Sequence, residues 1–258
     1  MKEDKILERE RYDSRANDLL SRNIFKDKSF ENLHSAFKKP YLKYYKIIDL
    51  YIKSGMNVLE IGSGFGEHTE VLLKKGCNLT ISDISLECLK LLRERFNNIY
   101  DNINYIEADI ENLPFKKNEF DVICCAGVLS YGQSDLVFSE IKRVLKTNGR
   151  LICVDSLNHN IIYKLNRYLN YKKGKRTLST IKNMPDLGKI EKLKKDMTLE
   201  SVNYYGPFIW LNQIMRIFFS ERSIMKIDNF FDNISFLQKY AFKFVIHLQK
   251  KELKITNK

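Results

Sequence analysis

The chain has 258 residues, of which 44% are hydrophobic and 12% aromatic, so it can fold around a substantial core rather than remain disordered. Its net charge of +12 indicates an anionic binding partner. We expect no membrane span, because no apolar run reaches about 18 residues. We also expect a cytosolic location, because the charged first residues lack the apolar segment of a signal peptide.

The cysteines and histidines show no metal-binding pattern. The five cysteines are an odd number without CxxC spacing, which predicts buried free thiols rather than disulfides or metal ligands. The four histidines are scattered along the chain. The sequence therefore predicts chemistry that needs no metal ion.

Helical patterns precede the first predicted strand. Residues 1–30 alternate acidic and basic side chains around spaced leucines, which predicts one or two amphipathic helices, and Tyr41–Lys53 has helical periodicity. We expect residues 1–53 to form a helical cover ahead of a core at residues 54–156.

The stretch Val58–Thr69, VLEIGSGFGEHT, predicts a buried parallel strand, a tight loop and the start of a helix. Gly62, Gly64 and Gly66 can take positive φ and let the backbone approach a ligand. Alternate glycines behind Glu60 differ from the GxGxxG of dinucleotide-binding loops, in which pyrophosphate lies on the helix N-terminus. The spacing therefore argues against a nicotinamide-dependent oxidoreductase.

This alternate spacing resembles motif I of the class I S-adenosylmethionine (SAM) methyltransferases. SAM has no phosphate and carries a cationic amino group and a sulfonium, so a carboxylate at the strand end is suited to it. The resemblance implies that Glu60, Ser63 and the three glycines bind SAM.

The segment RYDSRANDLL resembles the N-terminal helix that many small-molecule methyltransferases fold over SAM. The resemblance implies that Tyr12 and Arg15 reach the methionine carboxylate. The alternative is a solvated helix face.

An acid also ends the second predicted strand, Asn78–Ser85. In this architecture the carboxylate of Asp83 lies in the ligand crevice, followed by Ile84, and can accept both ribose hydroxyls. Alternatively Asp83 caps the helix predicted at Leu86–Phe96, a role that Ser85 can also fill.

A third acid follows within Asn104–Ile110, the third predicted strand. The segment ADIENLPF resembles the third methyltransferase motif, which implies that Asp109 contacts the adenine amino group with Ile110 beside the ring. Three acids after successive strands, together with the glycine loop, make SAM the expected cofactor.

The later elements complete an α/β pattern. Phe120–Ala126 predicts a fourth strand, whose end from Ala126 to Tyr131 we expect to line the gap between cofactor and acceptor. The segment LKTNGRLICVD predicts a fifth strand, and Ile224–Asp228 and Phe242–Lys250 predict the last two. The resemblance implies a single domain with a Rossmann-like, mostly parallel seven-stranded sheet, helices on both faces and an antiparallel last strand.

Residues 157–222 are predicted as a basic helical insert that selects the substrate, ahead of C-terminal strands at residues 223–258. The Leu-x-His-Asn segment and the basic residues after it resemble a methyltransferase subset associated with glycan or secondary-metabolite modification. Three interpretations stay open. The cations could bind a phosphate, a carboxylate or a nucleotide-linked sugar; they could lie on anionic lipid with Trp210 at the interface; or they could form a solvated lid. The cations are Arg167, Lys172, Lys173, Lys175 and Arg176.

An alcohol acceptor needs a base, because its proton leaves as the oxygen attacks. His159 is the first candidate, since it follows the fifth strand and imidazole titrates in the useful range, with Asp155 to orient it. The alternative is a surface or helix-capping histidine.

We therefore expect a SAM-dependent methyltransferase that acts on a small polar acceptor, anionic and methylated at oxygen. The fourth strand ends in CAGVLSY and lacks the Asn-Pro-Pro-aromatic signature of base amine methylation, which argues against nucleic acid. The alternatives are a non-catalytic SAM-binding regulatory protein and a methyltransferase acting on a lipid or RNA.

Overall fold

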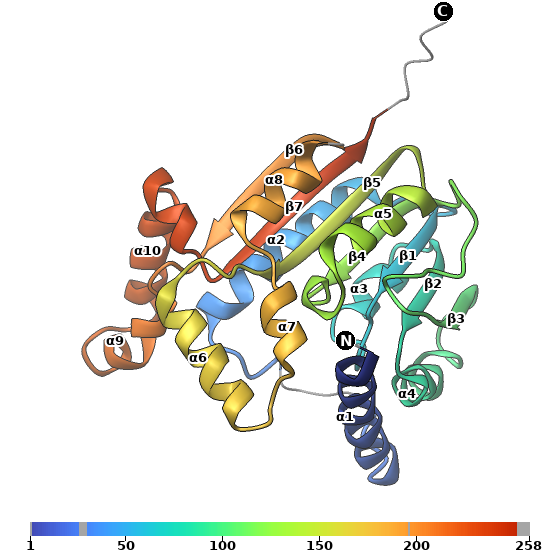
Figure 1. Cartoon of the computed structure of the whole chain (residues 1–258), viewed down its shortest axis with the longest axis horizontal. Coiled ribbons are helices and arrows are strands. Elements are labelled where there is room, and N and C mark those ends of the chain that lie inside the picture. Colours follow the sequence, from blue (N-terminus) through green and yellow to red (C-terminus); the bar gives the residue numbers. More distant parts are fainter. Residues whose placement is uncertain (1, 26–29, 196, 252–258) are drawn as a thin grey trace, which may run out of the picture.

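One sheet forms the centre of the computed structural model, which describes residues 2–25, 30–195 and 197–251 (Figure 1). Within these residues the seven strands have the order β3-β2-β1-β4-β5-β7-β6. β1 to β5 are parallel, whereas β7 is antiparallel to β5 and β6. This arrangement confirms the predicted fold and the antiparallel last strand. The strands are β1 Asn57–Ile61, β2 Asn78–Asp83, β3 Ile103–Glu107, β4 Phe120–Ala126, β5 Leu145–Ser156, β6 Met197–Tyr205 and β7 Lys243–Lys250.

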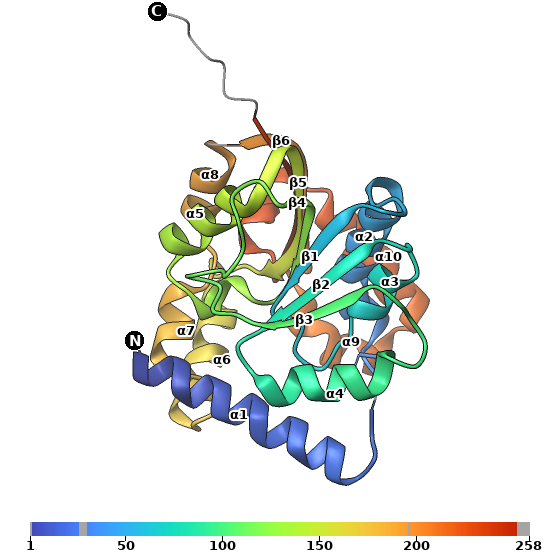
Figure 2. The same ribbon diagram turned by 90° about the vertical axis from the view of Figure 1, so that its right-hand side faces the viewer.

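Helices cover both faces of this sheet and its carboxyl edge (Figures 1 and 2). The α-helices among the described residues are α1 Lys2–Ser21, α2 Ser35–Tyr51, α3 Thr69–Leu73, α4 Leu86–Phe96, α5 Ser134–Val144, α6 Ile161–Lys172, α7 Leu178–Asn183, α8 Leu187–Lys195, α9 Asn212–Phe218 and α10 Glu221–Asp232. Short 3-10 helices lie at η1 Leu129–Tyr131, η2 Ile209–Leu211 and η3 Ser235–Tyr240. No helix in the described part of the chain is both long and apolar enough to cross a membrane.

The strand predicted at Ile224–Asp228 is wrong, because these residues lie in α10. The Ser220 hydroxyl caps this helix by accepting a hydrogen bond from the Ser223 amide at 3.3 Å. The edge strand is instead β6, within the predicted helical insert. β6 pairs with β7 alone and most of its side chains are half-buried or exposed, so it lacks the apolar alternation that identifies a strand.

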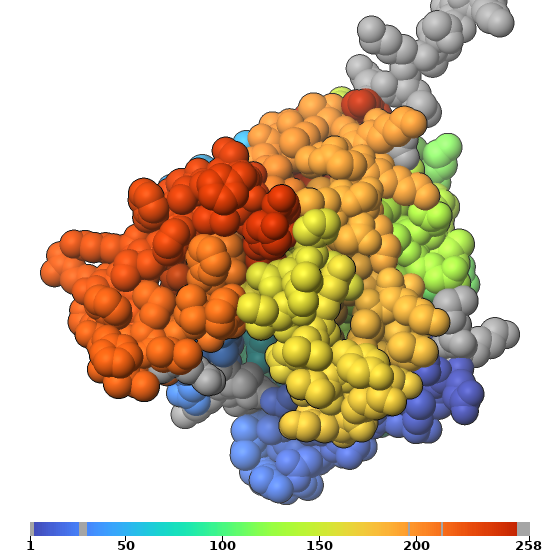
Figure 3. All heavy atoms as spheres, turned by 60° about the vertical axis from the view of Figure 1, so that its left-hand side comes forward, coloured from blue at the N-terminus to red at the C-terminus, as the bar shows by residue number. Residues whose placement is uncertain are grey.

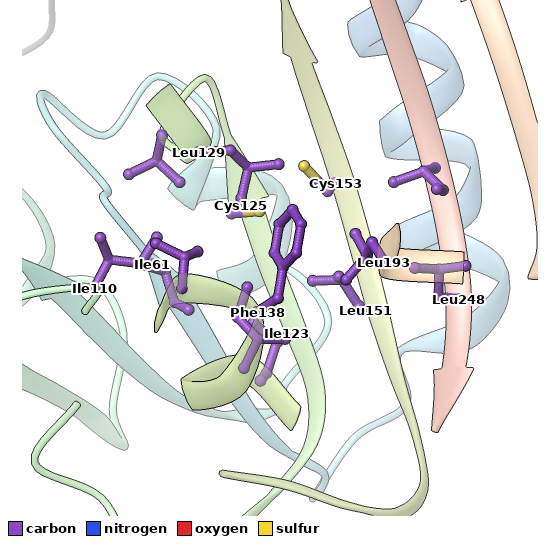
Figure 4. Packing of buried hydrophobic residues seen from close by; sticks show 14 of the residues in the cluster. Ile61, Ile110, Ile123, Cys125, Leu129, Phe138, Leu151, Cys153, Leu193 and Leu248 are labelled. Carbon is purple, nitrogen blue, oxygen red and sulfur yellow. The ribbon is translucent and has the colours of Figure 1, made fainter. Parts of the chain in front are cut away.

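Neighbouring residues of the central strands pack on opposite faces of the sheet. Ile61 belongs to the same buried cluster as Phe138 of α5 and Leu193 of α8 (Figure 4). Val58 instead joins the cluster that includes Ile48 of α2. This division follows from the alternation of side chains along a strand.

All five cysteines are buried and free, which confirms the prediction of unpaired thiols. Burial raises the pKa of the Cys77 thiol to about 11 and that of Cys88 to about 12. At neutral pH these two side chains are therefore protonated, apolar components of the packing.

The N-terminal helix α1 lies beside α4 at the carboxyl edge of the sheet (Figure 2). Ala16 of α1 is fully buried in a cluster with Phe65 of the glycine loop and with Leu91 of α4. This packing places the first turns of α1 over the strand ends.

Gly66 is the position at which the packing of the glycine loop against α4 can be tested by substitution. It has a φ of 71°, and a Cβ there would lie 2.3 Å from Cδ2 of the buried Leu92. We expect Gly66→Ala to lower the free energy of unfolding through both strain and the clash. Gly55 has a φ of 79° and no atom within 4 Å of a Cβ, so Gly55→Ala contributes strain alone.

Urea denaturation should show a loss of about 1–2 kcal/mol for Gly55→Ala and about 1–3 kcal/mol more for Gly66→Ala. Equal losses for the two variants would show that Leu92 does not constrain the loop.

Candidate functional site

A cavity of about 490 Å³ opens at the carboxyl ends of β1, β2 and β4. Its walls also come from the segment after β3, from α1 and from the connection between α6 and α7. Open α/β sheets bind ligands at this edge, and small-molecule sites have volumes of about 300–1,000 Å³. The position and the size of the cavity therefore suit a small-molecule ligand.

Every residue predicted to bind the cofactor lines this cavity except Gly66. The lining members of that set are Tyr12, Arg15, Glu60, Gly62, Ser63, Gly64, Asp83, Ile84, Asp109, Ile110 and Ala126. Gly66 lies behind the loop, where it packs against Leu92 of α4. Its function is therefore to let the loop approach α4.

Hydrogen bonds tie the glycine loop to β2. The Gly62 and Ser63 amides donate to the Ser82 carbonyl at 2.8 and 3.2 Å. The Ser63 hydroxyl oxygen is buried and has no hydrogen-bond partner among the described residues. An unsatisfied buried hydroxyl on a cavity-lining residue is a group that a bound ligand can satisfy.

Glu60 lies near the carboxyl end of β1 and has a carboxylate that is only 4% exposed. The Thr69 hydroxyl donates to its Oε2 at 2.7 Å, and burial raises the pKa of the Glu60 carboxyl to about 7. A cationic group brought into the cavity would favour the ionised form of this carboxyl.

Asp83 follows on the neighbouring strand and is 8% exposed. Its Oδ2 accepts a hydrogen bond from the Gly64 amide at 2.8 Å, and its Oδ1 accepts one from Ser85 at 2.9 Å. Burial raises the pKa of the Asp83 carboxyl. The helix α4 is capped by the Ser85 hydroxyl, which accepts from the Cys88 amide, so the capping role falls to Ser85.

Asp109, after β3, is the third carboxylate of the cavity. Its Oδ1 accepts from the Glu111 amide at 2.9 Å, and its Oδ2 accepts from the Lys5 ammonium at 2.5 Å. Lys5 also pairs with Glu111 at 2.6 Å. The first turn of α1 is thereby fastened to the segment after β3.

The middle of α1 covers the glycine loop. The Tyr12 ring stacks on the Phe65 ring with 5.5 Å between centroids, and the Arg15 guanidinium lies 4.6 Å from the Phe65 centroid. The hydroxyls of Tyr12 and Tyr131 are 3.0 Å apart. Tyr131, predicted to contact the substrate, lines the cavity from η1.

Further residues of α1 that were not predicted also line the cavity, namely Asp4, Lys5, Glu8 and Arg11. Together with Tyr12 and Arg15 they follow helical spacing, so one face of α1 meets the cavity. This periodicity was available in the sequence. The ring contacts of Phe65 and Tyr41 depend on tertiary packing, so they could not be predicted from the sequence.

The predicted pair of His159 and Asp155 is not formed in the described structure. His159 is exposed and lies outside the lining of the cavity. Asp155 is buried, and its oxygens accept from the amides of Leu129 at 2.9 Å and Ser156 at 2.6 Å. The neighbouring Asn160 points inward and donates to the Pro207 and Tyr240 carbonyls, which leaves His159 on the outer side of the turn.

Of the two predicted substrate arginines, Arg176 lines the cavity and Arg167 does not. Arg167 is 5% exposed and donates to the Leu157 carbonyl at 2.9 Å and to Asn158 at 3.0 Å. Burial lowers its pKa to about 10, with a further contribution from the nearby Arg176. Arg167 therefore supports the chain after β5 rather than lining the site.

His68 is the histidine that lines the cavity within the described residues. Its ring stacks on Tyr41 with 4.7 Å between centroids, and its Nδ1 is 2.7 Å from the Tyr45 hydroxyl. Burial lowers the pKa of His68 to about 3, so the imidazole is neutral at physiological pH.

Known proteins with similar sequences and folds are methyltransferases. A family model described as a methyltransferase domain matches residues 59–153. The ubiquinone/menaquinone biosynthesis C-methyltransferase UbiE of Shewanella piezotolerans is 29% identical over 175 residues, which are 59% of this chain and 69% of that protein.

Two solved structures share the fold. A SAM-dependent methyltransferase from Aquifex aeolicus superposes with a TM-score of 0.54 and 16% identity, covering 87% of this chain and 99% of that one. The geranyl diphosphate C-methyltransferase from Streptomyces coelicolor, solved with Mg²⁺, geranyl diphosphate and S-adenosyl-L-homocysteine, gives a TM-score of 0.56 and 13% identity. Its match covers 81% of this chain and 79% of that one.

The environment of Glu60 predicts an unusual titration. We expect the carboxyl to lose its proton near pH 7 in the protein without ligand, because burial disfavours the charge. Thr69→Val removes the hydroxyl that stabilises the carboxylate, so the midpoint should move higher. Carbon NMR of labelled glutamate carboxyls, with the signal assigned by its loss in Glu60→Gln, measures both. A midpoint in the ordinary range of about 4–5 would contradict this burial argument.

Proposed function

We propose that this chain, which is a class I S-adenosylmethionine-dependent methyltransferase, transfers the methyl group to a small anionic acceptor. One observation carries the proposal. Lys175 and Arg176 line the same cavity as the strand-end carboxylates, and neither has an acidic partner among the described residues. Acids on the sheet side suit the cationic cofactor, and cations on the insert side suit an anionic acceptor.

The residues around the glycine loop support a cofactor position. We propose that Glu60 holds the amino group of the cofactor, Asp83 the ribose hydroxyls and Asp109 the adenine amino group. The buried hydroxyl of Ser63, which lacks a partner in the described structure, supports this fit. When bound, SAM supplies an electrophilic methyl group on its sulfonium.

The other predicted contacts follow from the same placement. We propose that Tyr12 and Arg15, which lie against Phe65, reach the methionine carboxylate. Ile84 and Ile110 would give the nucleoside an apolar surface, and Gly62 and Gly64 would let it approach the backbone. By covering the loop, α1 would exclude water from the reacting atoms.

On the acceptor side, the main task of the protein is alignment. Arg11 forms an ion pair with Glu8 and donates to the Lys175 carbonyl and the Tyr131 hydroxyl. It therefore connects α1 to the basic wall, the name we give to the cavity-lining residues Lys175 and Arg176. We propose that Lys175 and Arg176 hold a phosphate or carboxylate of the acceptor, such as a nucleotide-linked sugar or a phosphorylated metabolite. This grip would orient the accepting atom toward the methyl group.

For the accepting atom, the proposal is oxygen. An alcohol must lose its proton. His159 lies outside the cavity lining, and the lowered pKa of His68 disfavours proton uptake, so we assign this role to neither histidine. Carbon is the second candidate, because UbiE relatives are named as C-methyltransferases. NMR of the product made with labelled SAM distinguishes a methyl group on oxygen from one on carbon.

Asp83 gives the first test of the cofactor position. We expect Asp83→Ala to weaken SAM binding by about 1–3 kcal/mol, because buried hydroxyls lose a charged acceptor. Isothermal titration calorimetry measures the change, with Asp49→Ala as the control, since Asp49 is exposed and bonded to Lys75 outside the cavity. Unchanged affinity in a folded Asp83→Ala protein would refute this assignment.

The basic wall gives the second test. We expect Arg176→Ala and Lys175→Ala each to raise the KM for a phosphorylated acceptor by about tenfold, because each removes a charge-assisted contact. The KM for SAM should change little. Lys173→Ala is the matched control, because Lys173 is exposed and lies outside the lining. Equal turnover of charged acceptors and their uncharged analogues by the unaltered enzyme would overturn the anionic class.

A further inference from the structure

The helix α6 presents its apolar side to the solvent. Ile161 is 78% exposed, Leu165 58% and Leu169 47%, and their spacing places them along one stripe of the helix. The inward side instead carries Arg167, which is only 5% exposed. A surface helix of a globular protein normally buries its apolar stripe, so the orientation of α6 is reversed.

The α9–α10 region also exposes large apolar side chains. Ile217 is 74% exposed and Phe218 73%, and Phe230 of α10 is 66% exposed. The buried positions there include Asn212 and Asp228, whose side chains hydrogen-bond to each other at 3.3 Å. Ile224 of α10 is fully buried as well, so the inward side of this region is mixed, whereas several of its largest apolar side chains face outward.

These helices lie on one side of the molecule. Tyr163 of α6 donates to the Gly206 carbonyl at 2.7 Å, and Asn160 donates to the Tyr240 carbonyl at 3.0 Å. Figure 3 shows α6 in yellow beside α9 and α10 in orange to red. We name this surface the docking face and define it by its exposed apolar residues, Ile161, Ile162, Leu165, Leu169, Trp210, Ile214, Ile217, Phe218, Phe219, Phe230 and Phe236.

The docking face is surrounded by cations. Residues 157–185 contain no Asp or Glu, and Lys164, Lys172 and Lys173 are exposed on and just after α6. Further exposed cations lie at Arg216, Arg222, Lys226 and Lys239. The acids of α10 are engaged with the body of the protein, since Glu221 accepts from Ser35, Asp232 from Lys39, and Asp228 from Asn212.

We propose that the docking face binds the surface of a bilayer that contains anionic lipid. Exposed aromatic and aliphatic side chains on amphipathic helices, flanked by Lys and Arg, are the combination that inserts at the level of lipid headgroups. A patch of this apolar character is uncommon on a monomer without a binding role. This inference is independent of the acceptor proposed above.

Two other occupants fit the face less well. A second copy of the chain would bring two basic rims together, and like charges at an interface repel. RNA would meet the cations, but aliphatic side chains such as Ile161, Leu165 and Ile217 do not stack on bases as aromatic rings do. An anionic bilayer satisfies both the apolar centre and the basic rim.

The position of the docking face has a consequence for access. The segment after α6 that includes Lys175 and Arg176 also lines the cavity. Docking through α6 therefore places the basic wall of the cavity close to the lipid surface.

The test is co-sedimentation of the full chain with lipid vesicles. We expect binding to phosphatidylcholine vesicles that contain phosphatidylglycerol and much weaker binding to phosphatidylcholine alone, with salt reducing the former. The double variants Ile161→Ser/Leu165→Ser and Ile217→Ser/Phe218→Ser should each reduce the bound fraction by about tenfold. Ile99→Ser is the matched control, because Ile99 is 67% exposed outside the docking face and should leave binding unchanged.

Light scattering and SAM binding, measured on the same proteins, complete the test. We expect a monomer without vesicles and unchanged SAM affinity in the double variants, since the replaced side chains are exposed and outside the cavity. The proposal is overturned if the chain stays in the supernatant with phosphatidylglycerol vesicles, or if Ile99→Ser reduces binding as much as the double variants. It is also overturned if the chain is a dimer that these variants dissociate, which would assign the face to a second copy.

Discussion

The buried carboxylate near the carboxyl end of β1 is the constraint on which the site depends. Glu60 lies on β1, between β2 and β4, so its side chain reaches the cavity edge from the middle of the sheet. A buried carboxylate is costly to ionise unless a cation or hydrogen-bond donors compensate. Thr69 provides one donor and Arg95 a favourable charge, yet burial still raises the pKa of the Glu60 carboxyl. A cation that entered the cavity would therefore favour the ionised form of Glu60.

Besides the apolar cluster around Ala16, polar contacts hold α1 to the rest of the protein. Lys5 pairs with Asp109, Asp13 accepts from the Ser85 hydroxyl, and Glu8 accepts from Thr177, which follows Lys175 and Arg176 in the chain. One helix thereby joins the strand-end carboxylates to the insert. Polar contacts of this kind exchange readily with water or with a ligand, so α1 can be retained by different partners before and after the cofactor binds.

Asp109 illustrates this exchange. In the protein without ligand its Oδ2 is taken by Lys5, and in the proposed function the same carboxylate contacts the adenine amino group. Lys5 keeps a second partner in Glu111, so loss of the Asp109 contact need not release the helix. In this proposal α1 and the cofactor are coupled because both use the Asp109 carboxylate as a hydrogen-bond acceptor, rather than because they clash sterically.

Local sequence was enough for the features that local chemistry determines. The apolar runs of β1, β2 and β4, the alternate glycines and the acids at the strand ends are all readable without knowledge of packing. The positions of His159 and Arg167 were not readable, because they depend on contacts across the chain. Inward-pointing Asn160 turns His159 outward, and the Leu157 carbonyl holds Arg167 away from the cavity.

The wrong strand at Ile224–Asp228 has a different origin, and it is connected to the docking face. The rule that apolar side chains face inward underlies the interpretation of both helices and strands. In α9 and α10 several large apolar side chains face outward while Asp228 is buried beside Ile224, so the amphipathic pattern is blurred and a short apolar run resembles a strand. The rule assumes that water covers the whole outer surface. Several adjacent helices with a basic rim expose apolar side chains against this rule. The simplest physical reason is that a lipid surface, rather than water, covers that side.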